Sequence, residues 1–158
     1  MKNILIFCVN CLLIFIMGAC SQPKPSADTR DISKLRISLQ RTNCYGKCPV
    51  YKVTLHGSGI IEFDGYANTK MLGKHSAQIP VDSMRALLTD IETQGYFGLK
   101  DSYEEYQMTD LPTVFTEVEI DGILKKIKHY QGDLTTPQAL SDLETHIDEI
   151  AIIRRWLE

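Results

Sequence analysis

The chain has 158 residues, of which 44% are hydrophobic and 23% are charged, and its formal net charge at pH 7 is −3. This length suits one domain that is large enough to bury a core of its own. A slightly acidic chain without a basic patch has no electrostatic footprint for nucleic acid, so we predict no nucleic-acid partner.

The first twenty residues have the pattern of an export signal. A weakly basic start precedes an apolar run over residues 4–16, and small residues stand directly before Cys20. The run is shorter than the roughly 20 residues that a membrane-spanning helix needs, and a polar, proline-containing stretch follows it at once. The pattern predicts a signal peptide over residues 1–19, cleaved before Cys20.

Cysteine at the cleavage position resembles the lipobox of bacterial lipoproteins, in which this thiol is acylated. The match departs from the commonest pattern at Met17, where leucine is usual. The resemblance implies that Cys20 carries a covalent lipid, with no other cofactor, and that the protein is anchored to the membrane of a bacterial cell envelope. Ser21 after the cysteine fits retention in the outer membrane, facing the periplasm.

Beyond a tether over residues 20–33, residues 34–158 are predicted to form one domain that begins with short strands. Apolar and polar residues alternate over 35–40, 51–56 and 60–64, which is the period of half-buried strands. Glycines between the last two of these segments can supply the positive φ angles of a tight hairpin. Residues 69–79 are predicted to form a fourth, more polar strand.

Two helices and a second hairpin complete the predicted domain. Pro80 introduces apolar residues at helical spacing that stop before Gly95, and residues 96–112 look irregular. Asp121-Gly122 predicts a hairpin between two further strands, and a second apolar stripe predicts a helix near the C-terminus. We therefore predict an α+β fold, in which an antiparallel sheet of about five to six strands carries two helices on one face.

Cys44 and Cys48 are the cysteines that remain once the signal is removed and Cys20 is lipidated. An even pair in an oxidising compartment favours a disulfide. The three intervening residues, one of them glycine, let the Cα atoms approach within the roughly 4.4–6.8 Å that the bond requires. We predict a structural disulfide that fixes the entry into the next strand.

Two other interpretations of this pair stay open. Cys-x-x-x-Cys-Pro resembles the ligand motif of Sco-type copper chaperones, and His129 would then be the third copper ligand beside Cys44 and Cys48. Those chaperones have a helix after the motif, whereas residues 49–55 have the pattern of a strand. The other interpretation is thiol–disulfide chemistry, with neighbouring basic side chains lowering a thiol pKa.

A wider resemblance covers most of the predicted domain. The residues that carry it are Arg41-Thr42, Cys44-Tyr45-Gly46-x-Cys48-Pro49-x-Tyr51, Gly59, Asp110-Leu111-Pro112, Lys128-His129-Tyr130, Leu143, Ile147-Asp148 and Trp156. Together they are similar to a family of bacterial lipoproteins catalogued as a domain of unknown function, DUF6438. The resemblance implies a small envelope domain without an assigned activity, and it lends no catalytic residue.

The sequence favours binding over catalysis. The four histidines lack the spacing of known metal-ligand motifs, no nucleophile motif is present, and an enzyme that uses carboxylates remains an open alternative. We predict a non-enzymatic domain that binds an envelope protein or peptide. The expected contact residues, chosen because aromatic and methionine side chains are enriched at interfaces, are Tyr45, Tyr103, Tyr106 and Met108.

Overall fold

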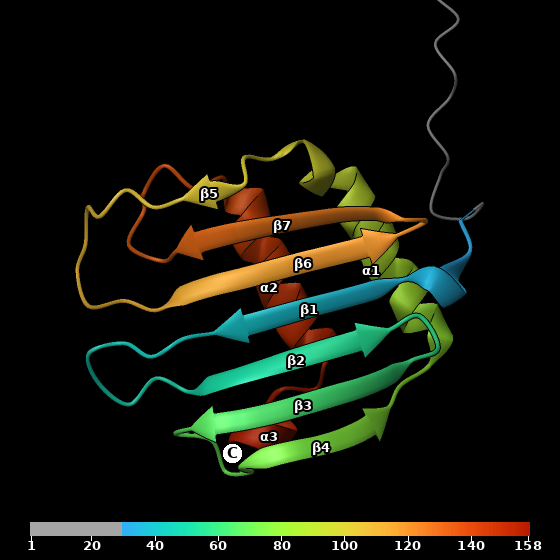
Figure 1. Cartoon of the computed structure of the whole chain (residues 1–158), viewed down its shortest axis with the longest axis horizontal. Coiled ribbons are helices and arrows are strands. Elements are labelled where there is room, and N and C mark those ends of the chain that lie inside the picture. The colour runs from blue at the N-terminus through green and yellow to red at the C-terminus, as the bar shows by residue number, and fades with distance from the viewer. Residues whose placement is uncertain (1–29) are drawn as a thin grey trace, which may run out of the picture.

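A seven-stranded sheet carries its helices on one face in the computed structural model, which describes residues 30–158 (Figure 1). The elements in chain order are η1 (Ile32–Lys34), β1 (Arg36–Arg41), β2 (Val50–His56), β3 (Ile60–Ala67), β4 (Gly73–Gln78), α1 (Val81–Thr93), η2 (Tyr96–Gly98), β5 (Ser102–Tyr103), β6 (Thr113–Ile120), β7 (Ile123–Tyr130), α2 (Gln138–Ile150) and α3 (Arg154–Leu157). Within this part of the chain, no helix has the length and apolar character needed to cross a membrane.

The predicted α+β class is confirmed, whereas the predicted numbers of strands and helices were too low. The strand order is β4-β3-β2-β1-β6-β7-β5, and all neighbours are antiparallel except the parallel pair of β5 and β7. The sequence missed β5 and α3 because two and four residues are too short to show a hydrophobic period. Their positions depend on neighbours that are distant in the chain.

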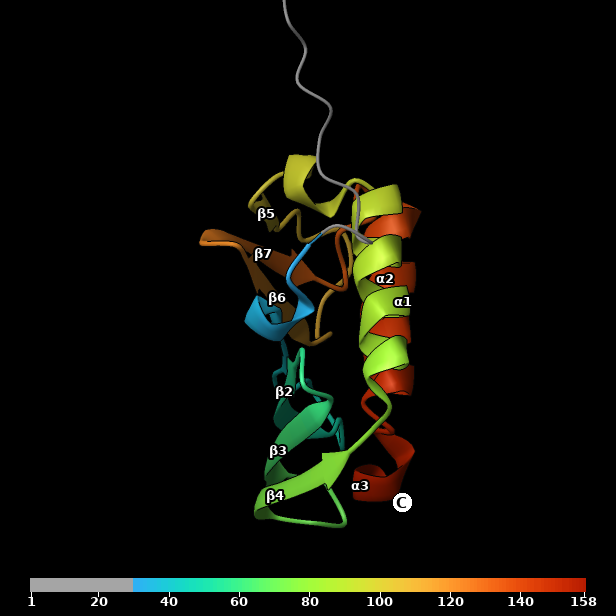
Figure 2. The same cartoon turned by 90° about the vertical axis from the view of Figure 1, so that its right-hand side faces the viewer.

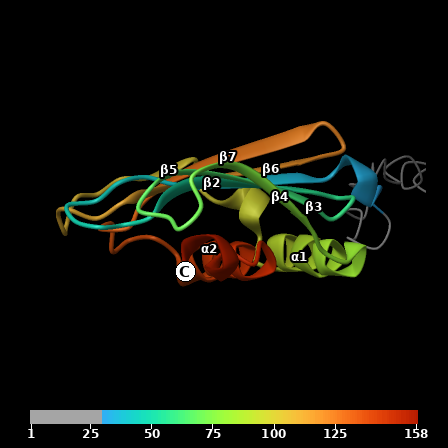
Figure 3. The same ribbon diagram turned by 90° about the horizontal axis from the view of Figure 1, so that it is seen from below.

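Helices α1 and α2 lie side by side over one face of the sheet, and the other face is left open (Figures 2 and 3). Strand residues that face the helices alternate with polar residues on the open face, as the period-two pattern predicts. The helices contribute two buried stripes, whose members are Met84, Leu87, Leu88 and Ile91 in α1 and Leu140, Leu143 and Ile147 in α2, which Ala151 continues at the C-cap. This single layer of packing between helices and sheet forms the core.

One end of the sheet carries the tight turns and the N-terminal part of the described chain, and we call it the turn end (Figure 1). Asp121 and Gly122 both have positive φ, at 51° and 78°, as a two-residue hairpin requires. Arg30 is buried at this end, with its Nε atom 2.7 Å from Oε1 of Glu92. Arg30 and the start of η1 fall within the stretch predicted as a tether, yet they pack on the domain. Cys20 and the predicted signal lie outside the described residues.

Candidate functional site

Three loops meet at the opposite end of the sheet, and we call them together the loop end (Figure 1). They are residues 42–49 between β1 and β2, 104–112 between β5 and β6, and 131–137 between β7 and α2. The Tyr45 amide donates to the Asp110 carbonyl at 3.1 Å, which joins the first loop to the second. The Met108 amide donates to the Gly132 carbonyl, which joins the second loop to the third. The loop end is therefore one connected surface.

The middle loop is held closely against the third. The Met108 amide donates to the Gly132 carbonyl at 3.2 Å, and a Cβ atom on Gly132 would stand only 2.4 Å from the Met108 carbonyl oxygen. The Asp133 carboxylate accepts from the amides of Glu105 and Thr135 at 2.9 and 2.8 Å. The hydrogen bond from the Thr135 hydroxyl is the main reason that the pKa of Asp133 lies below its ordinary value. These bonds fix the loops relative to one another.

Large apolar side chains project from this connected surface. Exposed fractions are 88% for Tyr45, 69% for Tyr106, 48% for Met108 and 70% for Leu134. Three of these residues were among the expected contact residues. Leu134 was not, although an apolar residue between polar neighbours in a turn is a signal for it.

Tyr103 does not belong to this surface, so its expected exposure was wrong. It lies in β5, is only 5% exposed and is part of the core. Its pairing with His129 of β7 places it against the sheet, and its hydroxyl accepts a hydrogen bond from the Lys100 amide at 3.2 Å. The residue looked like a loop residue because β5 is too short to be recognised in the sequence.

Cys44 and Cys48 lie within the first loop at disulfide-bonding distance, with Cα atoms 5.7 Å apart. The Asn68 side chain donates to the Cys48 carbonyl at 3.0 Å and ties this loop to the segment after β3. A disulfide between Cys44 and Cys48 would restrict the segment that carries the exposed Tyr45. This geometry agrees with the structural disulfide that the spacing predicts.

We expect protein purified from an oxidising compartment, without added reductant, to contain this bond in full. The unreduced peptide with Cys44 and Cys48 should be lighter in a mass spectrum by the two hydrogen atoms that the bond removes. Because the closed loop is small, replacing both cysteines by serine should lower the free energy of unfolding by less than about 3 kcal/mol. Two freely alkylatable thiols in that material would contradict the prediction.

A polar network ties the start of the first loop to helix α2. Arg41, the last residue of β1, donates through Nε and Nη2 to Oδ2 of Asp148 at 2.9 and 2.7 Å, and the Tyr51 hydroxyl donates to Oδ1 at 2.8 Å. Burial and the neighbouring carboxylate charge raise the pKa of Tyr51. Burial also raises the pKa of Asp148, and the donors on Arg41 and Tyr51 oppose this shift. The network is mostly buried, which suits a role in positioning the loop.

All three residues of this network are among those that carry the family resemblance, but the sequence could not show that they meet. Arg41 and Asp148 are 107 positions apart in the chain. Their contact depends on α2 crossing behind the end of β1, which no local pattern specifies.

His129 is held by a buried carboxylate and does not form a ligand group with the cysteines. Its Nδ1 atom lies 2.9 Å from Oε2 of Glu144, and both side chains are buried. Within residues 30–158, no group of three or more His, Cys, Asp or Glu side chains is placed to hold a metal ion. The third ligand expected for the copper alternative was therefore wrong. A glutamate inside the apolar stripe of α2 was the sequence signal for this buried pair.

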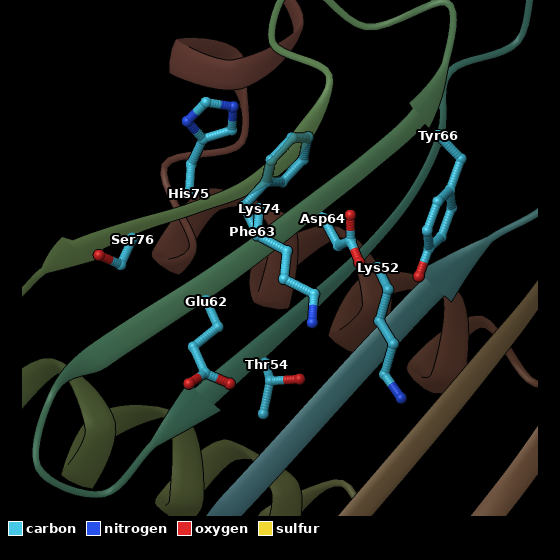
Figure 4. A pocket seen from close by; sticks show the side chains of 9 residues that line it. All are labelled: Lys52, Thr54, Glu62, Phe63, Asp64, Tyr66, Lys74, His75 and Ser76. Atoms are coloured by element: carbon cyan, nitrogen blue, oxygen red, sulfur yellow. The ribbon is translucent and has the colours of Figure 1, made fainter.

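A hollow of about 430 Å³ lies on the open face over β2, β3 and β4 (Figure 4). Opposite charges stand across from one another there, because Asp64 pairs in register with Lys52 on one side and Lys74 on the other. Such cross-strand pairs are typical of a solvated sheet face. This hollow therefore has its charges compensated within the chain, and the loop end remains the better candidate for a functional surface.

Comparison with known protein families identifies a family that matches this chain. The sequence profile of a family described as a domain of unknown function (DUF6438) matches residues 35–151. The match runs from the residue before β1 to the residue after α2, and it includes the cysteine loop and the Arg41–Asp148 network. No curated protein matches the chain. Because the match covers most of its length, the chain belongs to the DUF6438 family.

Proposed function

We propose that this chain is a lipid-anchored protein of the bacterial cell envelope and that its domain binds a protein or peptide partner through the loop end. One observation carries the proposal: Tyr45, Tyr106, Met108 and Leu134 are exposed on three loops that backbone hydrogen bonds join. Aromatic residues are the commonest anchors of protein interfaces. Binding by this domain would be non-enzymatic.

The rigidity of the loop end favours binding. Loops presented by a rigid scaffold commonly carry recognition, and side chains that are already ordered lose less entropy when a partner binds. The Tyr106 ring rests on the Tyr130 ring at a centroid distance of 4.6 Å, and the Tyr130 hydroxyl donates to the Met108 carbonyl at 2.9 Å. Tyr130 thus contacts both exposed residues and restricts their movement.

The position of Arg30 supports an orientation in which the loop end faces away from the membrane. The described chain enters the fold at the turn end, opposite the loop end (Figure 1). The ten residues from the predicted lipid site at Cys20 to Arg30 can span at most about 33–36 Å. An anchor on Cys20 would therefore hold the turn end near the membrane and leave the loop end free to meet a partner.

Replacing Tyr106 and Met108 together by alanine tests the proposed surface. Cross-linking in intact cells should identify the partner of the wild-type protein, and affinity for that purified partner should fall roughly 30-fold or more in the variant, as expected for interface anchors. The variant should keep the wild-type circular dichroism spectrum, because both side chains are exposed.

Ile123→Ala is the matched control, since Ile123 is also exposed but lies at the opposite end of the sheet. It should bind the partner as the wild type does. Equal affinity of the wild type and the Tyr106/Met108 double variant would show that the surface is misplaced.

Replacing Cys20 by serine tests the anchor. Metabolic labelling with a fatty acid should be lost, and the domain should leave the membrane fraction, because the thiol that accepts the lipid is gone. Cys11→Ser, a change within the predicted signal, should leave labelling intact. Labelling that persists in Cys20→Ser would exclude this residue as the lipid site.

A further inference from the structure

Four large apolar side chains are exposed at the turn end. Ile123 and Leu124 begin β7 directly after the tight turn of the β6–β7 hairpin, and they are 52% and 48% exposed. Ile60 begins β3, and Val81 begins α1 beside the exposed Asp82, which has no ion pair among residues 30–158. Apolar side chains that are exposed next to one another are a signal of an interaction surface. The adjacent pair on the hairpin is therefore the centre of this surface.

The chain that leads to the predicted lipid site joins the fold beside this hairpin. Arg30, the first described residue, is 8% exposed, and its Nη1 atom lies 3.7 Å from Oδ2 of Asp121 in the turn. Figures 1 and 3 show the described chain starting at the same end of the sheet as this turn. Ten residues separate Cys20 from Arg30. A lipid on Cys20 would therefore hold Arg30, and the hairpin beside it, at most about 33–36 Å from the membrane.

The charges around the hairpin are compensated within the chain. Asp121 faces Arg30, and Arg36 donates to Glu119 through Nε and Nη2 at 3.1 and 2.9 Å. Glu119 lies opposite Leu124 in the register of β6 and β7. A paired charge costs less to bring against an apolar medium than a free charge does. The hairpin therefore suits the headgroup layer of a membrane, where apolar and polar groups meet, and it needs no charged lipid.

We propose that the tip of the β6–β7 hairpin rests in the headgroup layer of the phospholipid membrane, with Ile123 and Leu124 against the acyl chains. This inference rests on the proposed lipid anchor on Cys20 and adds a second contact with the same membrane. A protein partner would have to reach this surface between the domain and the membrane to which it is tethered. Two exposed side chains bind a membrane weakly by themselves, but the anchor makes their contact intramolecular and so raises their effective concentration at the membrane. The second contact fixes the orientation of the domain and turns the loop end outward.

A tryptophan placed at either end of the sheet tests this contact. The chain has one tryptophan, the buried Trp156, whose signal in the wild type can be subtracted. The variants Ile123→Trp and Leu134→Trp are compared as acylated full chains in vesicles of phosphatidylcholine with brominated acyl chains, which quench tryptophan on contact. β7 is eight residues long, so roughly 26 Å separate the two ends of the sheet. A hairpin inserted about 5–10 Å deep should place only the tryptophan at position 123 within reach of the bromine atoms, and we expect at least about 3-fold stronger quenching there than at position 134.

A second set of variants tests the native side chains. In the Leu134→Trp protein, replacing Ile123 and Leu124 together by serine should increase quenching, because the domain would turn freely on its tether and bring the loop end to the lipid. Leu72→Ser is the matched control, since Leu72 is also exposed but directly precedes β4, away from the β6–β7 turn; it should leave quenching unchanged. All variants should keep the wild-type circular dichroism spectrum, because the replaced side chains are exposed.

The proposed anchor and this inference can be told apart when they fail. If fatty-acid labelling shows no lipid on Cys20, the anchor is wrong and this inference falls with it. If Cys20 is acylated and the protein is bound to vesicles, equal quenching at positions 123 and 134 overturns this inference alone. Unchanged quenching of Leu134→Trp after the double serine replacement would overturn it as well, because those two side chains would then not hold the domain.

Discussion

Replacing Asp148 by alanine is expected to lower the free energy of unfolding by about 3–5 kcal/mol, the usual cost of removing one partner from a buried ion pair. The side chains of Asp148 and Arg41 are only 13% and 18% exposed. Without the carboxylate, the Arg41 guanidinium stays buried with its charge uncompensated, and the Tyr51 hydroxyl loses its acceptor. Urea unfolding followed by the fluorescence of Trp156 measures the change.

Two further variants separate the ion pair from other effects. Glu149→Ala, at an exposed neighbouring position of α2, should change stability by no more than about 0.5 kcal/mol. Combining Asp148→Ala with Arg41→Met should cost less than the sum of the two single changes, because no unpaired charge remains. A loss below about 1 kcal/mol for Asp148→Ala would show that the network contributes little to the fold.

Replacing Trp156 by alanine is expected to cost a further large share of stability, about 3–5 kcal/mol. Its ring is stacked on Phe63 at a centroid distance of 5.2 Å and an angle of 8°, and its indole N–H donates to the Ala151 carbonyl at 3.2 Å. It is one of the largest fully buried side chains. Its removal leaves a cavity between α3 and β3 that the neighbours cannot fill. Thermal unfolding followed by circular dichroism measures the loss.

Trp156→Phe should cost less than Trp156→Ala, because a smaller ring still packs on Phe63. Leu157→Ala, a change at the next and only partly buried position, should have the smallest effect of the three. The family match ends at residue 151, so wild-type stability in Trp156→Ala would mean that the domain ends there too. The expected loss would extend the folded unit to α3.

The loop end illustrates what could and could not be foreseen. Three of the four expected contact residues are exposed there because they lie in irregular segments with no apolar period. Tyr103 was misplaced, since its burial comes from pairing with β7 and not from its own neighbours in the chain. The bond between Tyr45 and Asp110 joins loops that are 65 positions apart, and only the order of the strands brings them together.

The sequence by itself determined the long strands, both long helices, the turn at Asp121-Gly122 and the possible closure of the Cys44–Cys48 loop. Each depends on side-chain spacing or on backbone preferences within about a dozen residues, which the chain carries locally. Only the tertiary structure decided that Asp148 reaches Arg41 and that Glu144 holds His129 beside the uncapped start of α2. Those contacts arise where α2 packs across the sheet, and the free energy that selects them comes from burial of the whole core, not from any single segment.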